Sequence, residues 1–261
     1  MICLSFDIEE FDVPLENGVR YDTQKEGMLM SQNGLERILN ILDNNTARAT
    51  FFCTSNFVQN SMELVRSIIK SGHEVASHGC NHWEPKIGDA TRSKEILEDI
   101  LGVRINGYRQ PRMFRVDNNE LAECGYSYNA SLNPTFIPGR YAHIKSPRTP
   151  WLENGVVQIP TSVSPLLRIP MFWLALHHYP QSFYQWLTKR IIKKDGSFNT
   201  YFHPWEFCPL SRYPELKIPY IIRRRSGEDM EKRLNRLVSF LKQSGEEFGT
   251  YYDYSKIIRE K

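Results

Sequence analysis

Short apolar runs alternate along this chain with amphipathic segments that have helical spacing. The apolar runs predicted as strands are residues 2–6, 49–53, 74–76, 105–108, 126–130, 156–159 and 199–202. The segments predicted as helices are residues 33–43, 62–70, 93–101, 118–124 and 230–241. Repeated strand–helix units favour an α/β fold with parallel strands and outer helices, as a barrel or a doubly wound sheet. A last apolar run at residues 250–252 is expected to close the sheet.

Length and charge exclude two broad classes of protein. The 261 residues fit one domain of α/β-barrel size or two small ones, and either can bury a sizeable core. A hydrophobic content of 41% and the near balance of 33 Lys+Arg with 30 Asp+Glu exclude a disordered chain. The net charge of +3, without a long basic run, argues against a nucleic-acid partner.

Nothing in the sequence divides the chain into units. We expect one domain over residues 1–261, with an irregular, Pro-rich insertion around 132–180. Five widely spaced cysteines without a CxxC pair do not form a disulfide framework, which favours a reducing compartment. A secretory signal is missing, and so is an apolar stretch of spanning length, about 18 residues. The expected location is the cytoplasm, in association with the inner face of the membrane.

One stretch, residues 166–194, combines aromatic, aliphatic and basic side chains. An interfacial surface that contacts lipid has this composition. A core helix with an exposed basic face has it too, and such stretches are more often core. We therefore keep peripheral membrane contact through 166–194 as the second interpretation.

Carboxylates follow the first predicted strand. If the extended backbone continues, Asp7 and Glu9 point to the same side, since side chains alternate along a strand. Two carboxylates so placed repel each other and favour a cation or a proton between them. Taken alone, the pair is most simply an acidic loop.

Histidines follow the third predicted strand. His78 and His82 are four residues apart, so a helical turn would place both imidazoles on one face. Two histidines and one carboxylate, with positions left open for water, form the ligand set of a catalytic zinc site or of a similar divalent metal.

Two further polar clusters complete the pattern. Arg109 follows the fourth predicted strand, and His203 follows the strand at 199–202. Each cluster alone has an ordinary structural explanation. However, all four lie at the carboxyl ends of predicted strands, where an α/β barrel builds its active site.

Together these clusters resemble the successive motifs of the polysaccharide deacetylases, the NodB-homology type of carbohydrate esterase. The matching residues are Asp7, Glu9, His78, His82, Arg109, Pro111 and His203. The resemblance runs from about residue 2 to 210 and is closest to a branch with Asp-x-Glu in the first motif and His-Pro-Trp-Glu, here residues 203–206, in the last. It implies a distorted (β/α) barrel with fewer than eight regular strands, a divalent metal, and removal of N-acetyl groups from amino sugars.

The resemblance also implies roles for single residues. Asp7 matches the general base, and Arg109 matches the arginine that holds it. Glu9, His78 and His82 match the ligands of a divalent metal, with zinc expected and other ions open. His203 matches the general acid.

Two parts of the expected site have no motif of their own. The usual Asp that supports the acid is missing, with Asn129 as its expected position and Glu206 as the alternative. The residues expected to contact a glycan, which is lipid-linked in one interpretation, are Tyr108, Pro111, Arg112, Trp205 and Trp83.

Other functions stay open on the sequence alone. The motifs indicate cleavage of a C–N amide more clearly than they identify the attached group. An N-formyl sugar or a cyclic amide, as for an allantoinase, is therefore the alternative substrate. A non-catalytic glycan-binding module is less favoured, because the base, the ligands and the acid are all present.

Overall fold

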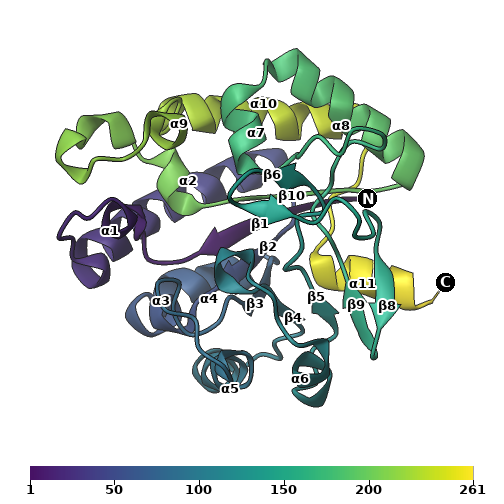
Figure 1. Cartoon of the computed structure of the whole chain (residues 1–261), viewed down its shortest axis with the longest axis horizontal. Coiled ribbons are helices and arrows are strands. Elements are labelled where there is room, and N and C mark those ends of the chain that lie inside the picture. The colour runs from purple at the N-terminus through teal and green to yellow at the C-terminus, as the bar shows by residue number, and fades with distance from the viewer. Residues whose placement is uncertain (261) are drawn as a thin grey trace.

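A curled sheet with helices packed around it forms the body of the protein, as a computed structural model that describes residues 1–260 shows (Figure 1). The strand order is β10-β1-β2-β3-β4-β5-β9-β8. The strand bounds are β1 (Ile2–Ile8), β2 (Ala49–Cys53), β3 (Glu74–Ser77), β4 (Gly107–Tyr108), β5 (Tyr128–Asn129), β8 (Trp151–Glu153), β9 (Val156–Gln158) and β10 (Phe198–Phe202). Every pairing from β10 to β9 is parallel, and β8 joins antiparallel at one edge. The expected distorted barrel is confirmed.

The centre of the sheet is buried on both faces. All seven residues of β1 and all five of β2 and β10 are buried, as expected of parallel strands covered by helices. Phe6 of β1 is in register with Phe51 of β2 and Phe202 of β10. Its ring stacks on that of Phe51 at 5.2 Å. These contacts fix the strands whose ends carry the site.

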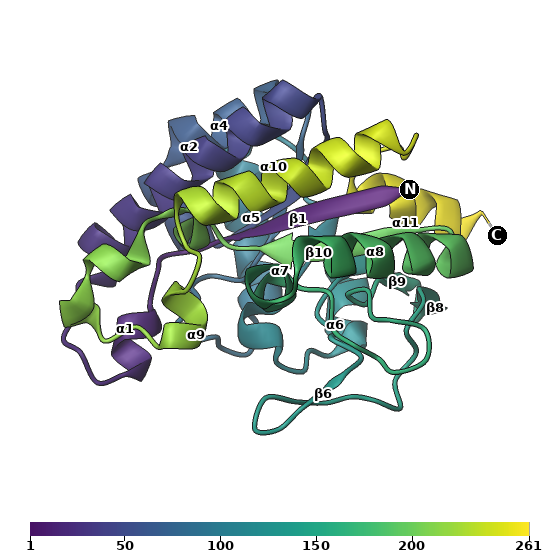
Figure 2. The same ribbon diagram turned by 90° about the horizontal axis from the view of Figure 1, so that it is seen from above.

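The helices lie around the sheet, with α3 to α6 on one side of it and α2, α7, α8 and α10 on the other (Figure 1). Their bounds are α1 (Val13–Glu16), α2 (Met28–Asn45), α3 (Ser55–Asn60), α4 (Met62–Lys70), α5 (Asp89–Leu101), α6 (Asn118–Glu123), α7 (Trp173–His178), α8 (Gln181–Asp195), α9 (Tyr220–Arg223), α10 (Glu228–Gln243) and α11 (Tyr251–Arg259). Helices α2 and α10 pack against each other (Figure 2). α2 begins five residues before its predicted start, and α5 begins four residues early.

Residues 250–252 were expected to close the sheet, and this expectation was wrong. Among residues 1–260, no pairing joins the edge strands β8 and β10. Residues 250–252, predicted as a closing strand, instead begin α11. Thr250 accepts a hydrogen bond from the backbone N–H of Asp253 (3.0 Å), and the Asp253 carboxylate accepts from Thr250 in return. This capping box starts a helix, and Tyr251 and Tyr254 then pack on the core.

The stretch 132–180 is largely irregular. It contains the small hairpin β6 (Phe136–Ile137) and β7 (Tyr141–Ala142), and it supplies β8 and β9 to the main sheet. Leu166 and Leu167 lie in a turn and are 86% and 77% exposed, so the apolar run becomes helical only at α7.

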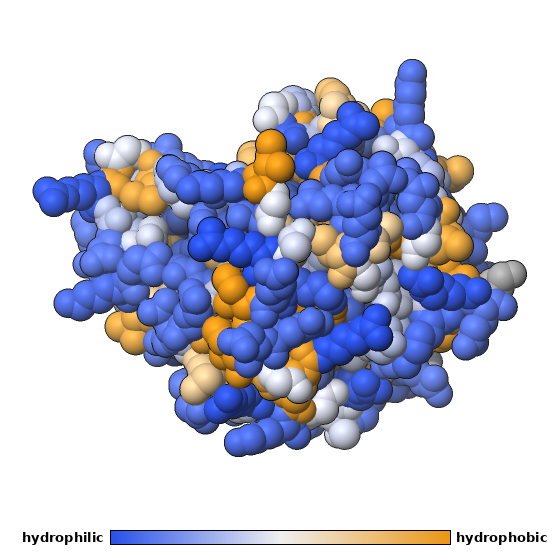
Figure 3. Space-filling model, turned by 90° about the horizontal axis from the view of Figure 1, so that it is seen from below, coloured by the Kyte–Doolittle hydropathy of each residue, from blue (hydrophilic) through white to orange (hydrophobic). Residues whose placement is uncertain are grey.

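The surface gives no sign of a spanning segment. Hydrophilic side chains cover most of the face seen in Figure 3, with hydrophobic ones gathered near its middle. Among residues 1–260, no helix has the length and apolar character needed to cross a membrane.

Candidate active site

A cavity of about 360 Å³ lies where neighbouring parallel strands end. Because β10, β1, β2 and β3 run the same way, their carboxyl ends meet at one edge of the sheet. Side chains from these ends and from the following loops line the cavity, among them Asp7, Glu9, His78, His82 and His203. The sequence motifs thus converge on one place.

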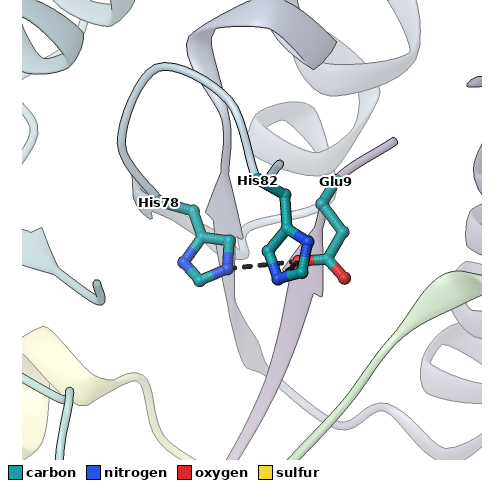
Figure 4. A group of neighbouring side chains, drawn as sticks. All are labelled: Glu9, His78 and His82. Atoms are coloured by element: carbon teal, nitrogen blue, oxygen red, sulfur yellow. Dashed lines mark hydrogen bonds and ion pairs between the residues drawn. The ribbon is translucent and has the colours of Figure 1, made fainter. Parts of the chain in front are cut away.

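Glu9, His78 and His82 form a compact three-residue cluster (Figure 4). One ligand atom from each lies within 4.8 Å of the other two. The Nε2 atoms of His78 and His82 are 3.2 and 3.3 Å from Glu9 Oε2. The histidines lie on a loop after β3 rather than on a helical turn, yet their rings are nearly parallel at 5.9 Å. The cluster is therefore built by a loop fold that the i, i+4 argument did not predict.

A hydrogen bond at Nδ1 fixes the orientation of each histidine ring. His78 donates from Nδ1 to the carbonyl oxygen of Arg109 (2.8 Å), and His82 donates from Nδ1 to Asp12 Oδ2 (2.7 Å). These bonds leave both Nε2 atoms directed at Glu9, and a bond at Nδ1 is the usual arrangement of metal-ligating histidines. The Trp205 indole donates to Glu9 Oε1 (3.3 Å) and leaves Oε2 to the histidines. The donor set fits a divalent cation with positions left open.

The pKa shifts of Glu9 and His82 also indicate a cation site. Burial opposes ionisation of Glu9, but the charge on His82 and the hydrogen bond from His78 lower the pKa of Glu9 to about 2. Burial lowers the pKa of His82, but Glu9 and the bond to Asp12 raise it to about 9. The carboxylate is thus ionised and attracts positive charge, which a bound cation would supply in place of a proton.

Asp7 forms an ion pair with Arg109 and is not part of the Glu9, His78 and His82 cluster. Arg109, with no exposed surface, donates from Nη1 to Asp7 Oδ1. The guanidinium is fixed further by Nε, which donates to the Ala130 carbonyl (3.1 Å), and by the Phe52 ring 3.9 Å away. Asp7 is only 2% exposed, and this pairing holds its carboxylate in a fixed orientation.

His203 lies on the other side of Asp7, with Nε2 4.0 Å from Asp7 Oδ2. It donates from Nδ1 to Glu206 Oε1 (2.9 Å), and its backbone N–H donates to the same oxygen (2.6 Å). Burial lowers the pKa of His203, but the Glu206 bond and the nearby carboxylates outweigh this effect and raise it. His203 is thereby kept as a proton donor.

Asn129 does not take the position expected of a residue that supports His203. Its amide donates to Gln158 (2.9 Å) and Asn118 (3.1 Å), because β5 directs it toward β9 and α6. Glu206 supports the acid instead. It comes from η3 (Pro204–Phe207), the turn that His203 begins.

The five expected glycan contacts divide into three groups. Trp205 and Arg112 line the cavity. Tyr108 has no exposed surface and bonds Gln110 (2.6 Å), and Pro111 is buried, so both are core residues behind the cavity wall. Trp83 is 38% exposed but lines a different depression.

The Arg112 side chain is less free to contact a glycan than expected. Its guanidinium donates to Asp12 Oδ2 (3.0 Å) and to Glu16, so it closes one wall of the cavity.

Several site residues were missed by the sequence argument. Asp12 is the third acid after β1, and the acidic run 7–12 could have indicated it. Trp173 and His177 lie four residues apart on α7 and pack edge-on against each other at 5.6 Å. Trp173 also meets the His203 ring edge-on at 5.4 Å. No sequence motif marks Trp173 and His177, because both lie in the irregular stretch 132–180, far along the chain from the first motifs.

Comparisons with known proteins agree with this geometry. A family profile described as polysaccharide deacetylase matches residues 19–128, and one described as a domain of unknown function (DUF3473) matches residues 130–253. His78 and His82 fall in the first range, and His203 and Glu206 fall in the second. Asp7 and Glu9 precede both.

Two curated proteins match parts of the chain. It is 33% identical over 86 residues to the uncharacterized protein YlxY of Bacillus subtilis. It is 27% identical over 120 residues to a peptidoglycan deacetylase of Helicobacter pylori. These alignments cover 30% and 42% of this chain. They span only 26% and 41% of the relatives' lengths.

A solved structure matches over nearly the whole chain. A Mycobacterium smegmatis protein assigned to the polysaccharide deacetylases superposes with a TM-score of 0.70 at 19% identity. The match covers 99% of this chain and 90% of that one, so the fold is the same.

Proposed function

Because the chain belongs to the polysaccharide deacetylase family, we propose that it is a metal-dependent hydrolase that removes N-acetyl groups from amino sugars of a glycan. One observation carries this proposal. The Glu9, His78 and His82 cluster, Asp7 and His203 line the same cavity at the strand ends, and Arg109 is paired with Asp7 behind them. A cation site, a proton acceptor and a proton donor within one cavity are the parts that amide hydrolysis requires.

The residues that would hold the metal are Glu9 through Oε2 and the two histidines through Nε2. When bound there, a divalent ion such as zinc supplies polarisation of the acetamide carbonyl and activation of the attacking water. This chain's contribution is the orientation of those three atoms, which Asp12, Trp205 and the Arg109 carbonyl maintain.

Asp7 is the proposed general base. Its carboxylate accepts the proton of the water that attacks the carbonyl carbon. Arg109 holds the carboxylate in place, because its buried guanidinium donates to Asp7 and to the Ala130 carbonyl and not to solvent. Asp7 and Glu9 therefore have separate tasks, although one residue separates them.

His203 is the proposed general acid. Its Nε2 proton passes to the amine nitrogen as the C–N bond breaks, while Nδ1 stays bonded to Glu206. Such a group contributes on the order of 10²–10⁴ in rate.

A backbone N–H near Arg112 is the proposed contact for the oxyanion. Arg112 and Met113, which line the cavity, have φ values of 58° and 54°. This left-handed backbone is strained for non-glycine residues and is typically retained at active sites.

The proposed substrate is an N-acetylated glycan, in lipid-linked form, handled at the cytoplasmic face of a membrane. Leu166 and Leu167 support this, since they extend from a loop that is tied to the hairpin beside the cavity. Arg168 in that loop donates to the Ser146 carbonyl (2.8 Å), and Thr135 donates to the Arg168 carbonyl (2.8 Å). His143 and Arg140 of the same hairpin region line the cavity.

The test is acetate release by the purified, zinc-loaded chain from a panel of N-acetylhexosamine oligomers, with N-formyl sugars and cyclic ureides as the alternative substrates. We expect acetate release that His203→Ala reduces by about 10²–10⁴. Turnover of the ureides with no acetate release would instead favour the allantoinase-like alternative. A lack of turnover on every substrate would favour the glycan-binding module.

A further inference from the structure

A second buried histidine lies behind the catalytic acid. His177, in the last turn of α7, has no exposed surface. Its Nε2 is 2.9 Å from Glu206 Oε2, and its Nδ1 is 2.7 Å from the Arg224 carbonyl oxygen. Both partners are acceptors, but a neutral imidazole has one N–H to donate. A second proton must therefore lie between His177 and Glu206.

The contacts of Glu206 indicate where that proton resides. Glu206 has no exposed surface, and its Oε1 already accepts from the backbone N–H and Nδ1 of His203. Hydrogen bonds donated to a carboxylate stabilise its ionised form. An imidazole is also the more basic partner by about 2 pKa units in water. The proton therefore belongs on His177, which becomes an imidazolium.

The charged groups around the pair are few. Arg225 donates to the His177 carbonyl (2.7 Å), and Arg233 of α10 donates to the Leu176 carbonyl (2.6 Å). These cations bind backbone oxygens, and their charge opposes a cation on His177. Glu206 is the carboxylate that faces the His177 ring. On the far side of His203 stands Asp7 from β1.

We propose that His177 is a positioning residue for the proposed deacetylation: as an imidazolium it holds Glu206 Oε2, so that Oε1 keeps the His203 ring directed at the reaction centre. The proposal rests on the proposed function. The positive charge has a second effect, because it moderates the attraction of Glu206 for the proton on His203. His203 can then release that proton to the leaving amine more readily.

Imidazole ¹⁵N NMR of the zinc-loaded protein tests the protonation state without any turnover. His178, the next residue, is the internal control, since it lies partly exposed and its Nε2 is bonded to a backbone carbonyl, that of Ile221 (2.7 Å), and not to a carboxylate. At pH 7.5 we expect two protonated nitrogens on His177 and one on His178. A single protonated nitrogen on His177 would overturn the proposal, whether or not the protein releases acetate.

Kinetics of His177→Gln, His177→Leu and the control His178→Gln test the positioning role. The amide of Gln can still donate to Glu206, so we expect kcat to fall about tenfold for Gln, further for Leu, and KM to stay unchanged. With the imidazolium gone, the full charge of Glu206 acts on His203, so the alkaline limb of kcat/KM for His177→Gln should move to higher pH. A Gln profile that matches His178→Gln would contradict the role, even if Leu fails to fold. If the wild type releases no acetate, the proposed function fails and the NMR result still stands.

Discussion

Asp7 and Glu9 show how neighbours give two acids different chemistry. Asp7 is paired with a buried arginine, whereas Glu9 faces two histidine Nε2 atoms and an indole N–H. A carboxylate held by a fixed cation stays ionised and can accept a proton. A carboxylate oxygen that lies next to two histidine nitrogens is suited to bind a metal ion together with them.

This division predicts opposite behaviour for two substitutions. Asp7→Asn should lose turnover by about 10²–10⁴ and retain bound zinc, because the metal ligands are untouched. His82→Ala should lose both, because one of three ligands is gone. Metal content by mass spectrometry and acetate release measure the two properties. Loss of zinc in Asp7→Asn would show that Asp7 is a ligand.

Glu206 sets the pH range of the acid. It raises the pKa of His203, and the reaction needs protonated His203, so activity should fall as the pH rises through that pKa. Glu206→Gln removes the charge, and the alkaline limb of kcat/KM should move down by about 1–3 pH units. An unchanged alkaline limb would mean that another group controls it.

At the scale of elements, Gly34 decides how closely α2 approaches the turn that carries His203. A Cβ on Gly34 would lie 1.8 Å from the carbonyl oxygen of Pro204. A contact this short with backbone forces α2 and η3 apart, so the site should lose its alignment. The close approach therefore links a helix far from the cavity to the catalytic acid.

Gly34→Ala should lower the free energy of unfolding by about 1–3 kcal/mol and reduce kcat. Asn40→Ala, at an exposed position on the same helix, is the control and should change stability by less than about 0.5 kcal/mol. Urea unfolding measures both variants. Equal stability of the two variants would show that η3 can move without cost.

Sequence periodicity predicted the elements near the site better than those at the far edge of the sheet. The strands ending at Ile8, Ser77 and Phe202 are almost entirely buried and mostly hydrophobic, so their ends and the motifs that follow them could be located in the sequence. The α11 helix was mistaken for a strand because three residues cannot distinguish the two periods, and the cap at Thr250 decided it. Asn129 was ranked above Glu206 as the partner of His203, and this ranking was wrong, since only the register of β5 shows where Asn129 points.

At the scale of the whole molecule, charge is distributed unevenly. Residues 131–194 hold eight Lys and Arg but one acid, Glu153, although the chain as a whole is nearly neutral. The same stretch carries the exposed Leu166, Leu167 and Trp186. Basic and apolar groups side by side suit an anionic lipid surface. That residues 1–261 act as one domain stays a prediction.

Vesicle flotation tests the proposed membrane contact. The protein should bind phosphatidylglycerol vesicles at low salt and release them at high salt, because screening weakens the charge term. Leu166→Gln with Leu167→Gln should weaken binding about tenfold, whereas Leu152→Gln, on the edge strand β8, should not. Equal binding of all three proteins to neutral and anionic vesicles would contradict the proposal.

The central claim is that one divalent ion bound by Glu9, His78 and His82 is required for deacetylation. The most direct test titrates zinc into the metal-stripped protein while acetate release from an N-acetylglucosamine oligomer is followed. We predict no release without metal, and a rise that saturates at one equivalent of zinc. Full activity of the metal-stripped protein, or saturation at one equivalent in His82→Ala as well, would contradict the claim.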